Sequence, residues 1–480
     1  MSDTQSKGLL ALSLPLVISF TIRALLGTVD LIYASQLPGD SAVAAIGLFF
    51  PIEFTFIACW VGASAALTSY LSKAMGERHE GQLRQLLRTS LGIVAALSLL
   101  FLLIAAALWL LAPHLPRLKP AVVRDFQVYG STALAGIACC AFWSVIPDSL
   151  IKAHHDTRST MMAGLISGGL NVVLNTVFVY GVGWGIFGIG LATGLARLGS
   201  LVYALRRART LEEARRAEWA AAPPPPARKR RQRPGYTVDG LLNRPLAQLL
   251  ALGVPSALTY VLMATEGLLV NGVLTFLGDP TAALAAYAVY HRAQLLALMP
   301  VVATGVAVLP FVARHVGERR FDQVRSELRA AFLVHLGYVL LVVTPACFLL
   351  APVLAGGLAE SPTTRELAGF AIRFGAPLAA LCGLPFILCR PAFEALQRGA
   401  PGLAMAFVRY ALLSGPLALA GAWAARRAGA EPFHGLIAGL VTGSGIVSLI
   451  FTLWLARTLR ALGAPQGGAP SGASAASAPG

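Results

Sequence analysis

Five acidic residues lie inside long apolar segments of this sequence: Asp30, Glu53, Asp148, Glu266 and Glu394. A charge near the centre of a bilayer costs about 2.5–3.5 kcal/mol on insertion scales, so such groups face a cavity, pair with a cation or stay protonated. Burial also raises the pKa of a carboxyl group and brings its titration toward neutral pH. These residues therefore suggest reversible binding of a proton or a cation.

Asp30 is the strongest candidate for this chemistry, because it lies well inside the first apolar segment. Arg23 lies two helical turns earlier on roughly the same face, so a bridge between Arg23 and Asp30 that only fixes the helix is the structural alternative. Asn171 and Asn175 are spaced i, i+4 and share one face of the fifth apolar segment. Two such amides can hydrogen-bond a carboxylate or coordinate a cation, or they can join neighbouring helices.

The composition indicates an integral membrane protein. Of the 480 residues, 56% are hydrophobic and 12% are charged, and the charged share is about half that of soluble domains. The net charge of +16 comes from 38 Lys and Arg against 22 Asp and Glu. Basic residues in cytoplasmic loops orient membrane helices, so we expect no nucleic-acid partner. The six cysteines show neither zinc-type spacing nor a disulfide framework.

Twelve apolar segments are long enough to cross a bilayer as helices, which takes about 20 residues each. Their approximate bounds are 9–35, 42–72, 88–112, 126–151, 159–181, 185–206, 246–277, 281–313, 328–354, 366–391, 402–424 and 434–457. The loops and flank on the side of the termini carry 25 Lys and Arg, and the opposite loops carry 6. This asymmetry predicts a multi-pass protein of the cell (inner) membrane with both termini, and residue 230, in the cytoplasm.

The two halves of the sequence repeat at an offset of 241 residues. The clearest match sets the Gly-Glu-Arg turn at 76–78 against that at 317–319, with 7 identities in the 14 positions from 75 to 88. Each half has an even number of segments, so both halves have the same orientation. Such parallel repeats are a transporter architecture that works by alternating access.

We therefore expect an all-α integral membrane protein with twelve transmembrane helices in two parallel six-helix lobes around a central cleft. Residues 1–206 would form the N-terminal lobe and residues 246–460 the C-terminal lobe. Residues 207–245, which contain four consecutive prolines and a basic run, would be a disordered cytoplasmic linker. Residues 461–480 are rich in Ala, Gly, Ser and Pro and would be a disordered tail.

Several short motifs also follow one another in a fixed order. They are Pro15, the Val-Asp-x-Ile pattern at 29–32, the two Gly-Glu-Arg turns, the turn Asp156-Thr157-Arg158 with His155 before it, the pair Asn171 and Asn175, and the stretch 188–193. This ordered set resembles the multidrug and toxic compound extrusion (MATE) family of cation-coupled efflux transporters. The resemblance covers about residues 9–460.

The resemblance implies roles for the polar residues of the N-terminal lobe. Asp30 would bind the coupling proton or Na⁺, and Asn171, Asn175 and Thr193 would complete its polar pocket. Na⁺ at these four residues is the one metal ion that we consider. Asn175 stands where some members have Asp, so one acidic ligand that a tight Na⁺ site would use is missing.

In the C-terminal lobe, the resemblance makes Glu266 a second candidate for coupling or for binding substrate charge. A structural pair between Glu266 and Arg292 or Arg390 is the alternative. Glu53 and Asp148 are expected near helix ends, where charge is less costly, and we leave them out of the site.

The leading hypothesis is a monomeric antiporter that exports cationic or amphipathic organic compounds in exchange for H⁺ or Na⁺, without another cofactor. A lipid-linked saccharide flippase of the same superfamily is the alternative, and intramembrane arginines keep it open: Arg23, Arg197, Arg292, Arg373, Arg390 and Arg409. An intramembrane enzyme is the least favoured hypothesis, because the sequence shows no catalytic motif for metal-dependent or proteolytic chemistry. The expected partners are a small-molecule substrate and the lipid bilayer.

Overall fold

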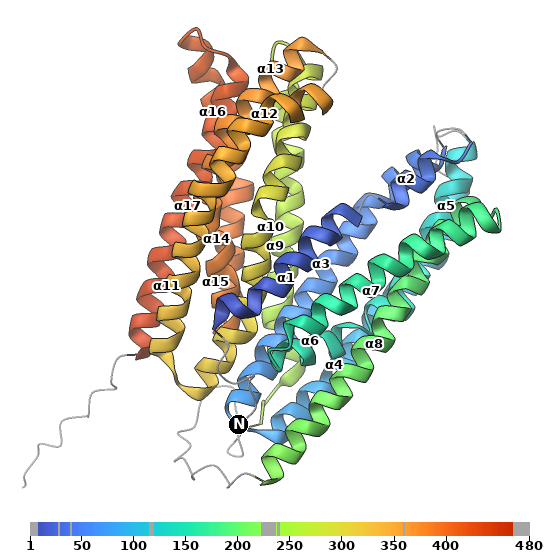
Figure 1. Ribbon diagram of the computed structural model, residues 1–480, viewed down its shortest axis with the longest axis vertical. Coiled ribbons are helices and arrows are strands. Elements are labelled where there is room, and N and C mark those ends of the chain that lie inside the picture. Colours follow the sequence, from blue (N-terminus) through green and yellow to red (C-terminus); the bar gives the residue numbers. More distant parts are fainter. Residues whose placement is uncertain are drawn as a thin grey trace, which may run out of the picture.

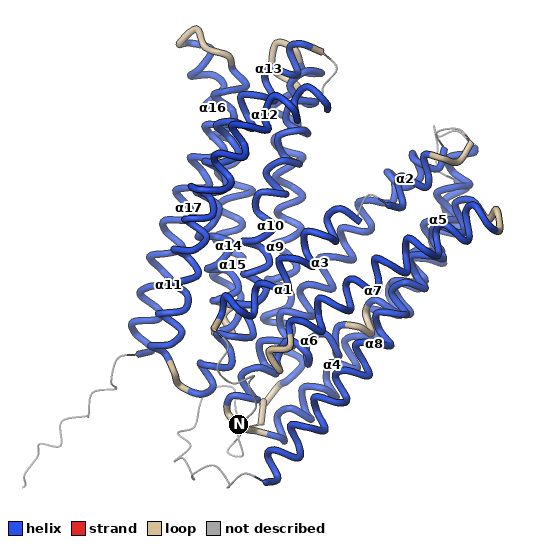
Figure 2. The backbone as a smooth tube through the Cα atoms, viewed as in Figure 1, coloured by secondary structure: helices blue, strands red, loops and turns tan. Residues whose placement is uncertain are grey.

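The computed structural model describes residues 8–26, 29–38, 41–114, 120–221, 237, 241–358 and 361–463. In this part of the chain the elements are all helices joined by short turns (Figure 2). A helix satisfies every backbone hydrogen-bonding group within its own segment, which is what an apolar stretch in a bilayer requires. The expectation of an all-α fold is confirmed. Residue 230 and the tail from 464 onward lie outside the described residues.

The helices of the N-terminal half are α1 (Leu9–Leu26), α2 (Val29–Ser35), α3 (Ser41–Gly76), α4 (Glu80–Leu111), α5 (Pro120–Gly136), α6 (Val145–Ala153), α7 (Thr157–Asn175) and α8 (Gly185–Ala221). Those of the C-terminal half are α9 (Pro245–Leu274), α10 (Pro280–Glu318), α11 (Phe321–Tyr338), α12 (Thr344–Leu358), α13 (Pro362–Phe370), α14 (Ala376–Ala395), α15 (Gly399–Ala406), α16 (Ser414–Arg427) and α17 (Pro432–Gly463). Short 3₁₀ or π turns continue several of them: η1 (Ala112–His114), η2 (Ile137–Ala141), η3 (Thr176–Gly181), η4 (Val339–Val343), η5 (Ala371–Gly375) and η6 (Phe407–Leu413).

Within the described residues, 10 helices are long and apolar enough to cross a bilayer. The count rises to 11 if the bent helix pair Pro120–Ala141 and Val145–Ala153 is taken as one span. The apolar stretch Leu9–Ser19 of α1, followed by α2, occupies the place of the expected first span. The described helices therefore agree with twelve spans.

The helices form two bundles, α1–α8 and α9–α17, that meet near the labelled N-terminus and diverge toward the other end (Figure 1). At the meeting end, α3 packs on α9 and α10. Helix α1 packs on both bundles, because it contacts α7 in its own half and α10 in the other. Its residues Leu9, Leu12 and Leu16 belong to the same buried cluster as Phe311 of α10. Helix α1 therefore links the two bundles mechanically.

The sequence repeat is visible in the backbone at the meeting end. Arg78 and Arg319, which are equivalent in the repeat, both have positive φ, 52° and 64°. His155 and Gln397 form a second such pair, with φ of 59° and 61°. Each of these residues follows the end of a helix, where a left-handed residue lets the chain turn back.

Glycines let the two bundles come into backbone contact at this end. A Cβ atom on Gly76 would collide with the Arg314 carbonyl oxygen, and one on Gly317 would collide with that of Lys73. Gly76 and Gly317 are equivalent in the repeat, so they lie where its pseudo-twofold axis crosses the contact. Small residues are the usual means by which membrane helices approach this closely.

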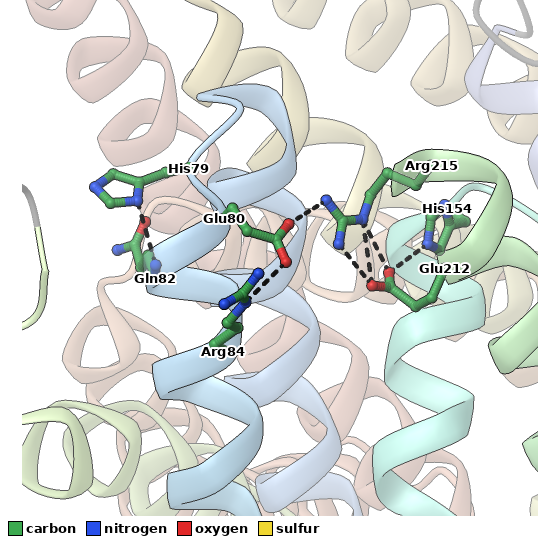
Figure 3. A network of polar contacts seen from close by, with 7 residues as sticks. All are labelled: His79, Glu80, Gln82, Arg84, His154, Glu212 and Arg215. Atoms are coloured by element: carbon green, nitrogen blue, oxygen red, sulfur yellow. Dashed lines mark hydrogen bonds and ion pairs between the residues drawn. The ribbon is translucent and has the colours of Figure 1, made fainter. Parts of the chain in front are cut away.

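The expected disordered linker over 207–245 is wrong at its start, because α8 continues to Ala221. Charged residues hold this extension (Figure 3): Arg215 bonds Glu80 of α4 at 2.6 Å and Glu212 at 2.8 Å. Glu212 also bonds His154, at the end of α6, at 2.8 Å. The apolar segment ends at residue 206, where polar residues begin, but the helix continues through these polar residues. The prolines at 223–226 and the basic run at 228–233 lie outside the described residues.

Candidate functional site

Asp30 lies in the first turn of α2, and its carboxylate accepts three hydrogen bonds from α7 and α8. Asn175 Nδ2 donates to Oδ1 at 2.9 Å and Asn171 Nδ2 donates to the same oxygen at 3.1 Å. Thr193 Oγ1 donates to Oδ2 at 2.8 Å. The structure thus brings together all four residues that the sequence proposed for the N-terminal pocket.

The donors also bond one another. Asn175 Nδ2 lies 3.2 Å from Asn171 Oδ1, and Asn171 Nδ2 lies 3.2 Å from Thr193 Oγ1. Asn175 is fully buried, and its Oδ1 has no hydrogen-bond partner among the described residues. The pocket therefore surrounds the carboxylate with hydrogen-bond donors, and it contains one buried acceptor, Asn175 Oδ1, that could accept a further hydrogen bond.

No cationic side chain of the described residues forms an ion pair with Asp30. The proposed Arg23–Asp30 bridge is not tested, because the side chain of Arg23 lies outside the described part. Asp30 is half-buried, and neutral groups supply its described bonds. A carboxylate held in this way changes its bonding when it gains a proton, because a protonated oxygen becomes a donor.

Local sequence features position these side chains. Asn171 and Asn175 occupy the last turns of α7, just before the π turn η3. Thr193 lies on the small-residue face of α8, where a Cβ atom on Gly190 would meet Thr132 and the Cα of Gly194 approaches that of Gly136. This close approach of α5 and α8 fixes the height at which the Thr193 hydroxyl reaches Asp30.

Glu53 belongs to the same region, although the sequence reasoning had left it out. It lies in the middle of α3 rather than near a helix end, and Arg197 Nη2 is 3.7 Å from its Oε1. Asp30 lies near enough to repel it electrostatically. Asp148, by contrast, forms an i, i+4 ion pair with Lys152 near the end of the short helix α6, as expected of a charge at a helix end.

The acids of the C-terminal half have a different environment. Ser414 Oγ donates to Glu266, and the positive charge of Arg409 also acts on it. Arg390 bonds Glu394 at 3.0 Å, so in the described residues the proposed Glu266–Arg390 pair does not form. Glu394 accepts a further bond from Ser256 at 2.7 Å.

The proposed alternative pair between Glu266 and Arg292 is likewise not found among the described residues. Over the same residues, no group of three or more His, Cys, Asp and Glu side chains could hold a metal ion. The set that the sequence proposed for a cation combines Asp30 with amide and hydroxyl oxygens. That set would supply one charged ligand.

Comparison with known proteins gives a consistent result. A family model described as MatE matches residues 15–177 and 255–420. The chain is 22% identical to the probable multidrug resistance protein YoeA of Bacillus subtilis, over 68% of this chain and 67% of that protein. It is also 22% identical to an FAD transporter of Shewanella oneidensis, over 86% of this chain and 88% of that protein.

Solved structures share the fold. An outward-facing conformation of a multidrug resistance MATE family transporter superposes with a TM-score of 0.78 at 22% identity, over 95% of this chain and 97% of that one. A transporter of the MOP superfamily from Pyrococcus furiosus, described as having a binding pocket of reverse polarity, gives a TM-score of 0.78 at 21% identity. The match covers 97% of this chain and 99% of that chain.

Proposed function

This chain belongs to the MatE family, whose model matches 15–177 and 255–420, and on that premise we propose that it is an antiporter that exports organic compounds in exchange for H⁺. The chain is a multi-pass membrane protein, and its curated relatives include multidrug resistance transporters. The two bundles would alternate in access as a monomer in the cell (inner) membrane, with both termini in the cytoplasm. No enzymatic step is part of the proposal.

The observation that supports the proposal is the pocket around Asp30. Three neutral donors from α7 and α8 stabilise its ionised form. Protonation would turn one carboxylate oxygen into a donor, so at least one of these bonds would break or reverse. The packing of α2 against α7 and α8 would then differ between the two protonation states, and the proton would shift the balance of conformations.

Helix α1 offers a route from this pocket to the other bundle. It immediately precedes α2, and its other end packs in the C-terminal core through Leu9, Leu12 and Leu16. A change at Asp30 that moves α1 and α2 would therefore act on the contact between the bundles. The positive-inside asymmetry places the end at which the bundles meet in the cytoplasm, so the bundles diverge toward the outside of the cell (Figure 1).

The proton is preferred to Na⁺ because the pocket supplies one carboxylate. Hard cations are held by oxygen ligands, several of them charged in tight sites. Here the amide groups of Asn171 and Asn175 present N–H to Asp30. Both amides would have to turn to offer oxygen to Na⁺, whereas a proton needs no such ligand set.

Amphipathic aromatic compounds are the proposed substrates. The Arg409 guanidinium lies over the rings of Phe386 and Tyr410, at 5.0 and 4.9 Å from their centroids. These rings are buried, so the contact packs Arg409 inside the C-terminal half. The proposal, which includes amphipathic aromatic compounds with negative charge, is supported by a relative that matches most of this chain and is named an FAD transporter. The flippase alternative is less favoured, because Arg197 and Arg390 each have an acidic partner.

Transport into inverted membrane vesicles tests the proposal. We expect a fluorescent organic substrate to accumulate when a proton gradient is imposed, and not when a Na⁺ gradient of equal size is imposed. Asp30→Asn vesicles with equal protein content should show no gradient-driven accumulation. Accumulation driven by Na⁺ alone would replace H⁺ by Na⁺, and accumulation without either gradient would refute antiport.

A further inference from the structure

Three charged residues of the N-terminal half, Asp30, Glu53 and Arg197, are connected through one face of α8. Thr193 and Arg197 are four residues apart on α8 and therefore lie on one face, about 6 Å apart along the axis. Thr193 bonds Asp30, and Arg197 pairs with Glu53 of α3. Two residues on adjacent turns of one face of α8 thus bind the two carboxylates of Asp30 and Glu53.

Arg197 is positioned by α3 but keeps bonding capacity. Its guanidinium lies 5.1 Å from the ring centroid of Phe56, which is three residues beyond Glu53 and faces the same way. The 3.7 Å contact with Glu53 is a loose ion pair and not a bidentate fork. Nη1 of Arg197 is buried and has no hydrogen-bond partner among the described residues.

The charges of this group depend on Asp30. With both acids ionised, Arg197 balances one of two negative charges. With Asp30 protonated, the Glu53–Arg197 pair is neutral. The other titratable groups that face these residues are Tyr129 of α5, which acts on all three, and Cys140 of η2, which acts on Arg197. Asn171 and Asn175 carry no charge, and Arg23 of α1 has a side chain outside the described part.

We infer that Glu53 and Arg197 are positioning residues that set the pH range over which Asp30 takes up and releases its proton. Glu53 repels the ionised form of Asp30, so it favours protonation. Arg197 attracts the ionised form, so it favours release. The two effects oppose each other. This inference rests on the proposed proton coupling at Asp30.

The opposed signs give a sharp test. In inverted vesicles, the pH midpoint of substrate transport should move to lower pH in Glu53→Gln and to higher pH in Arg197→Gln. Taking the one-turn spacing of Thr193 and Arg197 on α8, about 6 Å, as the scale of the charge separation, with an effective dielectric constant of about 20, each shift should be about 1–2 pH units. The double variant should return close to the wild-type midpoint. Glu53→Asp should keep the wild-type direction of coupling.

A second ion pair in the same bundle shows whether the loss of any ion pair would shift the pH midpoint. Asp148 and Lys152 form a pair in the same bundle, with side chains 13% and 10% exposed, and they do not contact the Asp30 pocket. Asp148→Asn should therefore leave the pH midpoint unchanged. If Arg197→Gln does not fold, Arg197→Lys keeps the charge and should keep the midpoint within a few tenths of a pH unit.

The outcomes separate this inference from the proposed function. Loss of coupled transport in Asp30→Asn together with unshifted midpoints in Glu53→Gln and Arg197→Gln would overturn the inference alone. Shifts of the same sign in both variants would also overturn it, because a structural defect and not charge would then be the cause. Normal coupled transport by Asp30→Asn would remove the premise of both.

Discussion

The two halves of the molecule share a backbone repeat, but Asp30 of one half and Glu394 of the other are bonded in opposite ways. In the N-terminal half, Asp30 receives its described bonds from two amides and a hydroxyl. In the C-terminal half, Glu394 is paired with Arg390 and is 3% exposed. A carboxylate among neutral donors can be titrated without leaving a bare charge behind, whereas one that neutralises a buried arginine cannot.

The contact between the bundles, in contrast, is nearly symmetric. Lys73 Nζ bonds Gln397 Oε1 at 2.7 Å, from α3 to the turn before α15. The equivalent turn before α7 carries His155, which interacts electrostatically with Arg314 of α10, the residue equivalent to Lys73. The His155 ring also lies 3.3 Å from the Pro310 carbonyl oxygen of α10. The repeat has therefore kept the surface where the halves meet and has let the interior charges diverge. We expect coupling in one half and support in the other.

The largest effect should come from Asp30→Asn. The amide keeps the size of the side chain and most of its hydrogen bonds, so folding and membrane insertion should be normal. Gradient-driven transport should fall to the level of vesicles without the protein, because no group is left to carry the proton. Transport in vesicles, normalised to protein content, measures this, and Asp30→Glu should retain activity with a shifted pH dependence.

The comparison between halves predicts that Glu266→Gln is milder. Glu266 interacts with the Ser414 hydroxyl and with Arg409, so its loss should change affinity for the substrate more than coupling. If Glu266→Gln were uncoupled and Asp30→Asn were coupled, the roles of the two halves would be reversed.

Glu394→Gln should give the largest loss of stability. It leaves Arg390 in the interior without its counter-charge, which costs about 3–5 kcal/mol when one partner of a buried pair is removed. A lower Tm in detergent would show this, with the pH midpoint of transport unchanged. Adding Arg390→Met should recover much of the loss. A stable Glu394→Gln variant with a shifted midpoint would instead place coupling in both halves.

The pocket of Asp30 could be predicted from the sequence because its members are rare polar residues in apolar helices. Spacing placed Asn171 and Asn175 on one face, and the family resemblance, which membership in MatE confirms, added Thr193. The all-α membrane fold followed from composition together with the length of the twelve apolar segments. That the pocket couples transport to an ion stays a prediction.

Glu53 and the partner of Arg390 could not be predicted, for a physical reason. Helix α3 is apolar on all sides, and such a helix shows no amphipathic stripe to tell which face points inward. The rotation of a membrane helix is set by packing against its neighbours. The segment 207–221 posed the opposite problem. Its charged residues resemble a linker, but they bond α4 and the end of α6, and Ala208, Leu211 and Trp219 pack on the N-terminal core.

Symmetry at the bundle contact predicts equal effects for Gly76→Ala and Gly317→Ala. Each new methyl group would press on a carbonyl oxygen of the other half. Overpacking of this kind costs typically about 1–3 kcal/mol, so both variants should shift the equilibrium toward separation of the bundles at this end. Gly92→Ala and Gly337→Ala are matched controls, because nothing lies within 4 Å of a Cβ atom there.

Cross-linking of cysteine pairs introduced across α3 and α10 would measure the shift. Unequal effects of Gly76→Ala and Gly317→Ala would show that the contact is less symmetric than the backbone indicates.

The equivalent turns before α7 and α15 differ at the residue with positive φ: the turn before α7 has His155, which can titrate, and the turn before α15 has Gln397, which cannot. His155 is buried and stacks with Phe311 and His315 of α10, at 6.2 and 6.4 Å between ring centroids. Burial, together with the positive charge of Arg314, lowers its pKa from 6.5 to about 3. The ring is therefore neutral while the bundles are in contact, and it donates Nε2–H to Pro310.

Acidification should therefore open this contact, mainly through the turn that contains His155. When the contact opens to water, the pKa returns to about 6.5, so between pH 3 and 6.5 the open state binds more protons and falling pH favours it. At pH 5.5 the open fraction should rise about tenfold relative to pH 8. Distances between spin labels on α6 and α10, measured in an Asp30→Asn background that removes the coupling site, would report it. His155→Gln copies the other turn and should abolish most of the pH response. If the response persists in His155→Gln, the titrating group lies elsewhere in the contact, with His315 of α10 the next residue to replace.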